Sequence, residues 1–279
     1  MHADPGVREP MSRVSPAVWA GAIVVVAAVV GGAAWWMGRS AETPPLAPVG
    51  TEPRPVAAAE PASEPVATPP AEVPSAPVVD PAPIADGDEA VTAALIERLG
   101  REAVLKLLQT DGFAARLVAT VDNLPRGHVA PRLWPVNPSP GRFSVDADGR
   151  IAADNAARYA PLVKLVDAMP PAEAAAFYRR LYPQLQAAYG ALGYPGQSFH
   201  QRLVEVLDHL LETPETSRPP QVALVEVKGD VASERPWVRY EYVDPALQSL
   251  SAGQRMLLRL GPAQQAKVMV WLRGLRGAL

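Results

Sequence analysis

An uncharged apolar segment near the N-terminus is the feature that most restricts how this chain can be organised. The 20 residues 18–37 include no Asp, Glu, Lys or Arg, and a helix of this length crosses the hydrocarbon core of a bilayer. Trp19 lies near one end, and Trp35 and Trp36 lie near the other, where amphipathic rings favour the two membrane interfaces. The sequence therefore predicts a transmembrane helix over residues 17–38, in contact with the lipid bilayer.

Flanking charges predict the orientation of this helix. Arg8 and Arg13 precede it together with the amino terminus, whereas Arg39 and, further on, Arg54 follow it. Because basic residues accumulate on the cytoplasmic side, we expect residues 1–16 to form a cytoplasmic tail. The rest of the chain is then expected in the periplasm of a bacterium, held by a single-pass inner-membrane anchor.

The same segment has two further interpretations. A cleaved signal peptide also begins with basic and apolar residues, but its apolar region usually spans about 7–15 residues and is followed by small residues rather than tryptophans. Ala27 with Gly31 and Ala28 with Gly32 place small residues at a spacing of four. Small residues at that spacing let two helices approach closely and would permit a homodimer through the membrane helix, but small residues are common in such helices anyway.

Proline dominates the next stretch. Thirteen of the 32 prolines lie between residues 44 and 83, and residues 39–87 contain little leucine or aromatic side chain to bury. Such a segment does not form a core, and its prolines favour extended polyproline II. We expect a disordered Pro/Ala-rich linker over residues 39–87, with a reach of roughly 100 Å or more.

Residues 88–279 supply enough chain for one compact periplasmic domain. They carry 22 basic and 20 acidic residues without a basic run, so we expect no nucleic-acid partner. The chain has no cysteine, which excludes disulfides and thiolate metal sites. Helical spacing of apolar residues predicts a mainly α multi-helix domain. Strand-like composition at 222–227 and 237–243, and at 143–145 before an Asp-Gly turn, predicts one or two small β-hairpins.

Helix starts are marked by capping signals. Ser198 with Gln201, and Ser251 with Gln254, have the spacing of a capping box. In such a box the serine side chain accepts a hydrogen bond from the backbone three residues later. The sequence therefore predicts one helix that begins after Ser198 and another that begins after Ser251.

Five short motifs stand out within the predicted domain. They are VATVDNLP at 118–125, PGRFSVD at 140–146, NAARYAPLV at 155–163, RLVEVLDHLLETP at 202–214 and SAGQRMLLRLGP at 251–262. Together they resemble an uncharacterised family of bacterial membrane-anchored proteins, domain of unknown function 3014. The resemblance implies the same arrangement of anchor, linker and domain, and it implies no assigned reaction, cofactor, partner or catalytic residue.

One predicted helix, over 198–213, carries the best candidate for chemistry. Glu205, Asp208 and His209 fall at spacings of three and four and share one side, with Arg202 nearby. Carboxylates and imidazole on one face could bind a metal or exchange protons. An amphipathic helix with a solvated polar side explains the same pattern, so we expect no metal and no cofactor, and no residue is assigned as catalytic.

A second candidate is a cluster of arginine and tyrosine. Arg158, Tyr159, Arg180 and Tyr182 lie on two neighbouring predicted helices, and their guanidinium and phenol groups together could hold a carboxylate, a phosphate or a sugar. Tyrosines at helical spacing are more commonly core residues with a satisfied hydroxyl. Both interpretations are kept as hypotheses.

The organisation favours a non-enzymatic cell-envelope interaction protein. Its anchor fixes one end, its linker sets the reach, and its domain meets an unknown periplasmic protein or envelope polymer. The alternative is an enzyme that acts on an envelope polymer of the peptidoglycan type, with Glu205 or Asp208 as acid or base.

Overall fold

The computed structural model describes residues 82–225 and 239–279. The predicted membrane helix over 17–38 and most of the predicted linker lie outside these residues. Within the described part of the chain, no helix combines the length and the apolar character needed to cross a bilayer.

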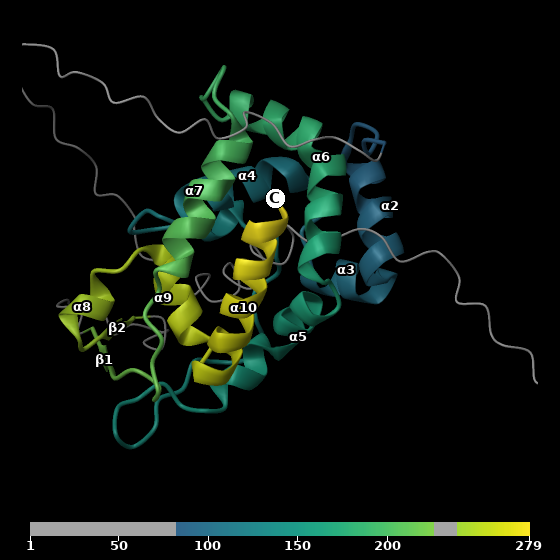
Figure 1. Ribbon diagram of the computed structural model, residues 1–279. Helices are drawn as coiled ribbons and strands as arrows, with labels where there is room; N and C mark the ends of the chain where they lie inside the picture. Colours follow the sequence, from purple (N-terminus) through teal and green to yellow (C-terminus); the bar gives the residue numbers. More distant parts are fainter. Residues whose placement is uncertain (1–81, 226–238) are drawn as a thin grey trace, which may run out of the picture.

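The described chain is mainly helical, as expected, with one small antiparallel sheet (Figure 1). In chain order the elements are α2 (Asp88–Leu99), α3 (Arg101–Leu107), α4 (Phe113–Asn123), the 3-10 helix η1 (Pro131–Leu133), α5 (Asn155–Asp167), α6 (Pro171–Ala191), α7 (Phe199–Leu211), β1 (Val222–Leu224), β2 (Tyr240–Tyr242), α8 (Pro245–Gln248), α9 (Ala252–Arg259) and α10 (Pro262–Ala278).

The long helix α6 organises the core. It packs against α4 and α10, and α7 packs against α4, α6 and α10. The apolar stripe of α6 formed by Phe177, Leu181 and Leu185 is buried, as its helical spacing indicates. Tyr178 and Tyr182, on the neighbouring stripe, are buried as well. Neighbouring helices therefore pack against two adjacent sides of α6, which lies at the centre of this group of core helices.

The first described residues are bound to α6. Ile84 is buried in the main core, and its backbone N–H donates to the carbonyl of Arg180 at 3.0 Å. Arg180 in turn donates to the carbonyl of Ala82, and the amide of Gln184 donates to the carbonyls of Ile84 and Ala85. Residues 82–87 were expected in the linker, but the apolar side chain of Ile84 brings this end of the chain onto the folded domain.

A smaller core lies beside the two-stranded sheet. Strands β1 and β2 pair antiparallel with Val222 opposite Tyr242, which confirms the predicted hairpin strands, while the connection between them lies outside the described residues. The shorter predicted hairpin is present as a single antiparallel bridge between Val145 and Ile151. The side chain of Arg259 is almost fully buried here, and its guanidinium lies 5.7 Å from the ring centroid of Tyr242.

The predicted caps form at both serines. Ser198 accepts a hydrogen bond from the backbone N–H of Gln201 at the start of α7. At the start of α9, Ser251 and Gln254 form the complete capping box, with side-chain to backbone hydrogen bonds in both directions. These bonds satisfy amides that have no partner within their own helix, so the predicted starts of α7 and α9 are confirmed.

Helix α9 begins directly against the end of α4. The backbone N–H of Gly253 donates to the carbonyl of Leu124 at 2.9 Å, and that of Ala252 donates to the carbonyl of Arg126 at 2.7 Å. A Cβ atom on Gly253 would lie 2.6 Å from Cδ2 of Leu210 in α7. The missing side chain therefore permits α4, α7 and α9 to meet, and this junction supports the site described next.

Candidate functional site

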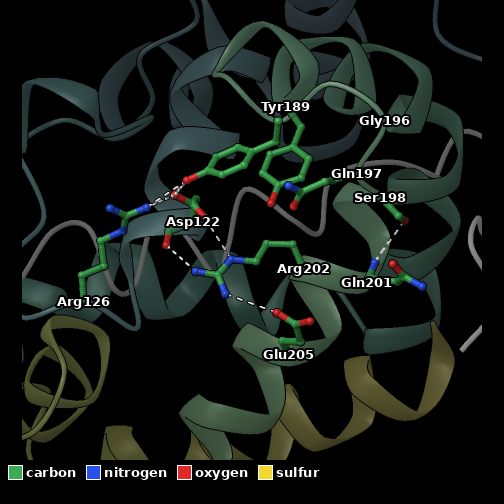
Figure 2. A pocket seen from close by; sticks show the side chains of 10 residues that line it. Asp122, Arg126, Tyr189, Gly196, Gln197, Ser198, Gln201, Arg202 and Glu205 are labelled. Atoms are coloured by element: carbon green, nitrogen blue, oxygen red, sulfur yellow. Dashed lines mark hydrogen bonds and ion pairs between the residues drawn. The ribbon is translucent and has the colours of Figure 1, made fainter. Parts of the chain in front are cut away.

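A polar pocket of about 510 Å³ opens between the end of α4, the end of α6 and the first turns of α7 (Figure 2). This volume falls within the range of roughly 300–1,000 Å³ that is typical of small-molecule sites. The residues that line it are Asp122, Arg126, Tyr189, Tyr194, Gly196, Gln197, Ser198, Gln201, Arg202 and Glu205. We call it the Asp122 pocket, because Asp122 connects the elements around it.

Asp122 occupies the last turn of α4 and is the buried centre of the pocket, with a side chain only 4% exposed. One carboxylate oxygen, Oδ1, accepts a hydrogen bond from Nε of Arg202 at 2.9 Å. The backbone carbonyl of Asp122 accepts a second bond from Nη2 of Arg202, also at 2.9 Å. Arg202 belongs to α7, so this two-point contact joins α4 to α7.

The second carboxylate oxygen of Asp122 has two partners. Oδ2 accepts from Nη2 of Arg126 at 2.7 Å and from the hydroxyl of Tyr194 at 3.3 Å. Arg126 also donates to the Tyr194 hydroxyl at 3.1 Å. The hydrogen bond with Asp122 is the main reason that the pKa of Arg126 is raised above its ordinary value. The carboxylate is thus surrounded by donors from three segments of the chain.

Aromatic rings form one wall of the pocket. The rings of Tyr189 and Tyr194 are stacked with their centroids 4.7 Å apart, and Phe199 lies behind Tyr189 at 5.5 Å. Burial raises the pKa of Tyr189, and the negative charge of Asp122 adds to this effect. The hydroxyl of Tyr189 therefore keeps its proton at neutral pH and can donate as well as accept a hydrogen bond.

Exposed polar side chains complete the rim. Gln197 and Gln201 are exposed, and Glu205 is 65% exposed while it accepts a hydrogen bond from Nη1 of Arg202 at 3.3 Å. In the view of Figure 2, Asp122 and Arg126 lie on one side of Arg202, and Gln197 and Gln201 lie on the other. The pocket therefore combines a buried, saturated ion pair with amide groups that are open to solvent.

The formal charges of this lining cancel. Arg126 and Arg202 supply two positive charges, Asp122 and Glu205 supply two negative ones, and each guanidinium contacts a carboxylate. Opposite charges already in contact leave little net attraction for a charged ligand. The arrangement is chemically suited to hydrogen bonding with a polar ligand.

The predicted polar face of α7 is divided by the structure. Arg202 and Glu205 line the Asp122 pocket, whereas Asp208 is held by the guanidinium of Arg276 from α10, with 2.7 Å between Nε and Oδ1. Nδ1 of His209 lies 3.9 Å from Oε2 of Glu212, the residue that follows α7. The described residues contain no cluster of three or more His, Cys, Asp or Glu side chains that could hold a metal ion.

The predicted arginine and tyrosine cluster is also divided. Arg158 donates to the carbonyls of Pro140 and Gly141 in a loop, and the side chain of Tyr159 is buried. Arg180 instead donates a hydrogen bond to the backbone carbonyl of Ala82. Tyr182 is buried in α6 and donates to the amide oxygen of Gln186 at 3.0 Å. The two tyrosines therefore serve as core residues, and these four side chains do not line the Asp122 pocket.

Eight of the ten lining residues were not among the candidate site residues drawn from the sequence. They are Asp122, Arg126, Tyr189, Tyr194, Gly196, Gln197, Ser198 and Gln201. A signal for Asp122 is present, since it is an acidic residue that follows the run Leu117–Val121 on the buried part of α4. Burial of a carboxylate needs a compensating charge or hydrogen bond, but the sequence does not say that Arg202, 80 positions away, supplies it.

Another buried polar pair lies next to the pocket wall. The hydroxyl of Tyr178 lies 3.1 Å from Nδ1 of His200, and both side chains are buried. Burial raises the pKa of Tyr178, so the phenol keeps its proton and shares a hydrogen bond with Nδ1 of His200. Burial, followed by the positive charge of Arg276, lowers the pKa of His200. The imidazole is therefore held in its neutral form.

Comparison with known proteins assigns the chain to a family. A family model described as "Protein of unknown function (DUF3014)" matches residues 113–276, which is more than half of the 279 residues. The matched range contains all five sequence motifs and every residue that lines the Asp122 pocket. Searches of curated proteins and of solved structures returned no match. The chain therefore belongs to the DUF3014 family.

Proposed function

We propose that this chain is a non-enzymatic cell-envelope interaction protein. A membrane helix over residues 17–38 anchors it in the bacterial inner membrane, and the linker carries the mainly helical domain into the periplasm. The Asp122 pocket is the place where the domain binds its partner, a periplasmic protein or an envelope polymer. The observation that carries this proposal is a pocket whose buried carboxylate accepts three hydrogen bonds from the pocket's own side chains while its rim amides are exposed.

Saturation of Asp122 favours binding over catalysis. A general acid or base must exchange a proton with the reacting group, but Oδ1 of Asp122 is bonded to Arg202 and Oδ2 is bonded to Arg126 and Tyr194. The carboxylate is also 4% exposed. Asp122 therefore acts as a structural acceptor that fixes the two arginines.

The enzymatic alternative is less well supported by the geometry. It names Glu205 or Asp208 as acid or base, but Glu205 accepts a hydrogen bond from Arg202 at the pocket rim, and Asp208 lies outside the pocket and forms two hydrogen bonds with Arg276. Glu205→Gln and Asp208→Asn each keep the size of the side chain and an acceptor oxygen while they remove the ionisable group, so each should leave any cellular phenotype of the protein unchanged. A loss of phenotype in either variant, with normal amounts of folded protein, would restore the enzymatic alternative.

Topology is testable because the chain has no cysteine. Ser12→Cys and Gln201→Cys each introduce a single thiol, one before the proposed membrane helix and one at the pocket rim. In intact spheroplasts, a membrane-impermeant maleimide should label position 201 from the periplasmic side and position 12 only after the membrane is opened. Labelling of both positions from the same side would contradict the proposed anchor.

Partner binding is tested by crosslinking in living cells. A photoreactive phenylalanine analogue at Gln201 should capture an envelope component, and the same group at the exposed Glu102 of α3 should not. Gln197→Ala in the same chain should reduce the capture at position 201. Equal capture from both positions, or capture that Gln197→Ala leaves unchanged, would argue against the pocket as the binding surface.

A further inference from the structure

The electrostatics of the Asp122 pocket limit the charge of its ligand. An anion would have to compete with Asp122, which contacts both Arg126 and Arg202 at 2.7–2.9 Å. A cation would find Asp122 already shared by two guanidiniums, and Glu205 at the solvated rim in contact with Arg202. Breaking contacts of this kind costs more than a new surface ion pair returns, so an uncharged ligand suits the pocket best.

The lining matches a ligand that has adjacent hydroxyl or amide groups. The side-chain amides of Gln197 and Gln201 each present one acceptor and a donor pair, and Arg202, whose three nitrogens each already donate to Asp122 or Glu205, keeps two further N–H groups in the same plane. The hydroxyl of Tyr189 donates and accepts, and Figure 2 shows it on the same side as Gln197. Planar groups with two polar atoms can bind two neighbouring hydroxyls at once, as they do with other paired oxygens.

The aromatic wall adds the apolar contact that such a ligand needs. Tyr194 is partly exposed and is backed by Tyr189 through ring stacking at 4.7 Å. The hydroxyl of Tyr194 is oriented by Asp122 and Arg126. A rigid aromatic residue that combines an apolar face with a fixed polar end can pack on the C–H face of a ring while its neighbours bond the hydroxyls.

From these three features we propose that the Asp122 pocket binds an uncharged saccharide. The proposal rests on the proposed function, since it names the chemical class that the envelope interaction would recognise. The pocket volume of about 510 Å³ accommodates a ligand of about two sugar rings. Arg202 and Asp122 shape the floor of the pocket, and Gln197, Gln201 and Tyr189 supply the recognition of hydroxyl and acetamido groups.

The test measures binding to the purified full-length chain by saturation-transfer NMR, with affinities from titration calorimetry. The neutral probes are N,N′-diacetylchitobiose, cellobiose and maltose, and the charged probes are inorganic phosphate and the zwitterionic dipeptide Ala-Ala. At least one neutral probe should bind saturably, with an affinity that changes less than about twofold between low and high salt, because no net charge is involved. Phosphate and Ala-Ala should not compete with it.

Variants assign the binding to the pocket. Gln197→Ala together with Gln201→Ala should weaken saccharide binding about 10-fold or more, the loss expected for two hydrogen bonds. Both positions are exposed, so the unfolding midpoint should not change. The control Glu102→Ala, at an exposed position of α3 that does not line the pocket, should bind as the unaltered chain does.

Three results would overturn the saccharide proposal. One is the failure of all three saccharides to bind, and another is saccharide binding that the double glutamine variant leaves unchanged. The third is glutamine-dependent binding of phosphate or Ala-Ala in place of the saccharides. In that last case the pocket would still be a binding site, so the crosslinking result at Gln201 would stand while the ligand class would be wrong.

Discussion

Removal of the Asp122 carboxylate should loosen the junction of α4 and α7. Asp122→Ala takes away the acceptor that Nε of Arg202 and Nη2 of Arg126 share. The Arg202 side chain is 25% exposed and that of Arg126 is 52% exposed. Because water solvates Arg126 more fully, the contact between Asp122 and Arg202 should contribute most of the stabilisation.

The size of the effect follows from this burial. Breaking a buried ion pair by removing one partner costs about 3–5 kcal/mol, and an exposed pair contributes about 0.2–1 kcal/mol. Arg202 keeps two acceptors after the change, the backbone carbonyl of residue 122 and Glu205. We therefore expect Asp122→Ala to lower the free energy of unfolding by about 2–3 kcal/mol. For a domain of this size, that lowers Tm by about 5–10 °C.

Double-mutant cycles separate the two contacts. Asp122→Ala is combined in turn with Arg202→Ala and with Arg126→Ala, and each full-length variant is unfolded in urea and followed by circular dichroism. The coupling energy should be about 1.5–2 kcal/mol for Asp122 with Arg202 and below about 0.5 kcal/mol for Asp122 with Arg126. If the two couplings are equal, or if the first is also below about 0.5 kcal/mol, burial does not determine the strength of these pairs and the reasoning fails.

Two further predictions concern packing and pH. Gly253→Ala should destabilise the fold by about 1–3 kcal/mol in urea unfolding, because its Cβ would overlap Leu210. The matched control Gly190→Ala, whose Cβ meets no described atom within 4 Å, lies in α6 and should leave stability unchanged or raise it by up to about 1 kcal/mol, because alanine has the higher helix propensity. Burial lowers the pKa of His200 in the folded state. As pH falls below about 6.5, His200 is therefore protonated in the unfolded chain before it is protonated in the folded chain, and the free energy of unfolding decreases. His200→Gln keeps a hydrogen-bonding partner for Tyr178. Between about pH 7.5 and pH 5, the free energy of unfolding should therefore decrease less for His200→Gln than for the unaltered chain. An equal decrease in both proteins would contradict this prediction.

Local features of the fold were predictable from the sequence. Capping signals correctly placed the starts of α7 and α9, since Ser198 and Ser251 accept the expected bonds within a few residues of themselves. The hairpin strands were identified because β-branched and aromatic residues favour a pleated strand. The buried stripe of α6 also followed from its spacing. These features depend on neighbours in the chain, which a sequence displays directly.

Contacts between distant segments were not predictable in the same way. Helical spacing correctly places Glu205 and Asp208 on one side of α7. It does not show that Glu205 lines the Asp122 pocket beside α4, or that Asp208 pairs with Arg276 of α10. The pairing of Asp122 with Arg202 likewise depends on how α4 and α7 pack. Arg202 and Glu205 were therefore found by sequence reasoning, and the aspartate that fixes Arg202 was not.

The attachment of residues 82–85 to α6 has a mechanical consequence. A force applied to the chain before residue 82 acts first on the contacts that hold this end of the chain to α6. These contacts are the buried side chain of Ile84 and the hydrogen bonds of Arg180 and Gln184. Tyr189, which walls the pocket, lies on the same helix about 7.5 Å further along its axis than Gln184. Force applied through the proposed linker would thus be delivered to α6, the helix that also carries Tyr189 in the wall of the proposed binding pocket.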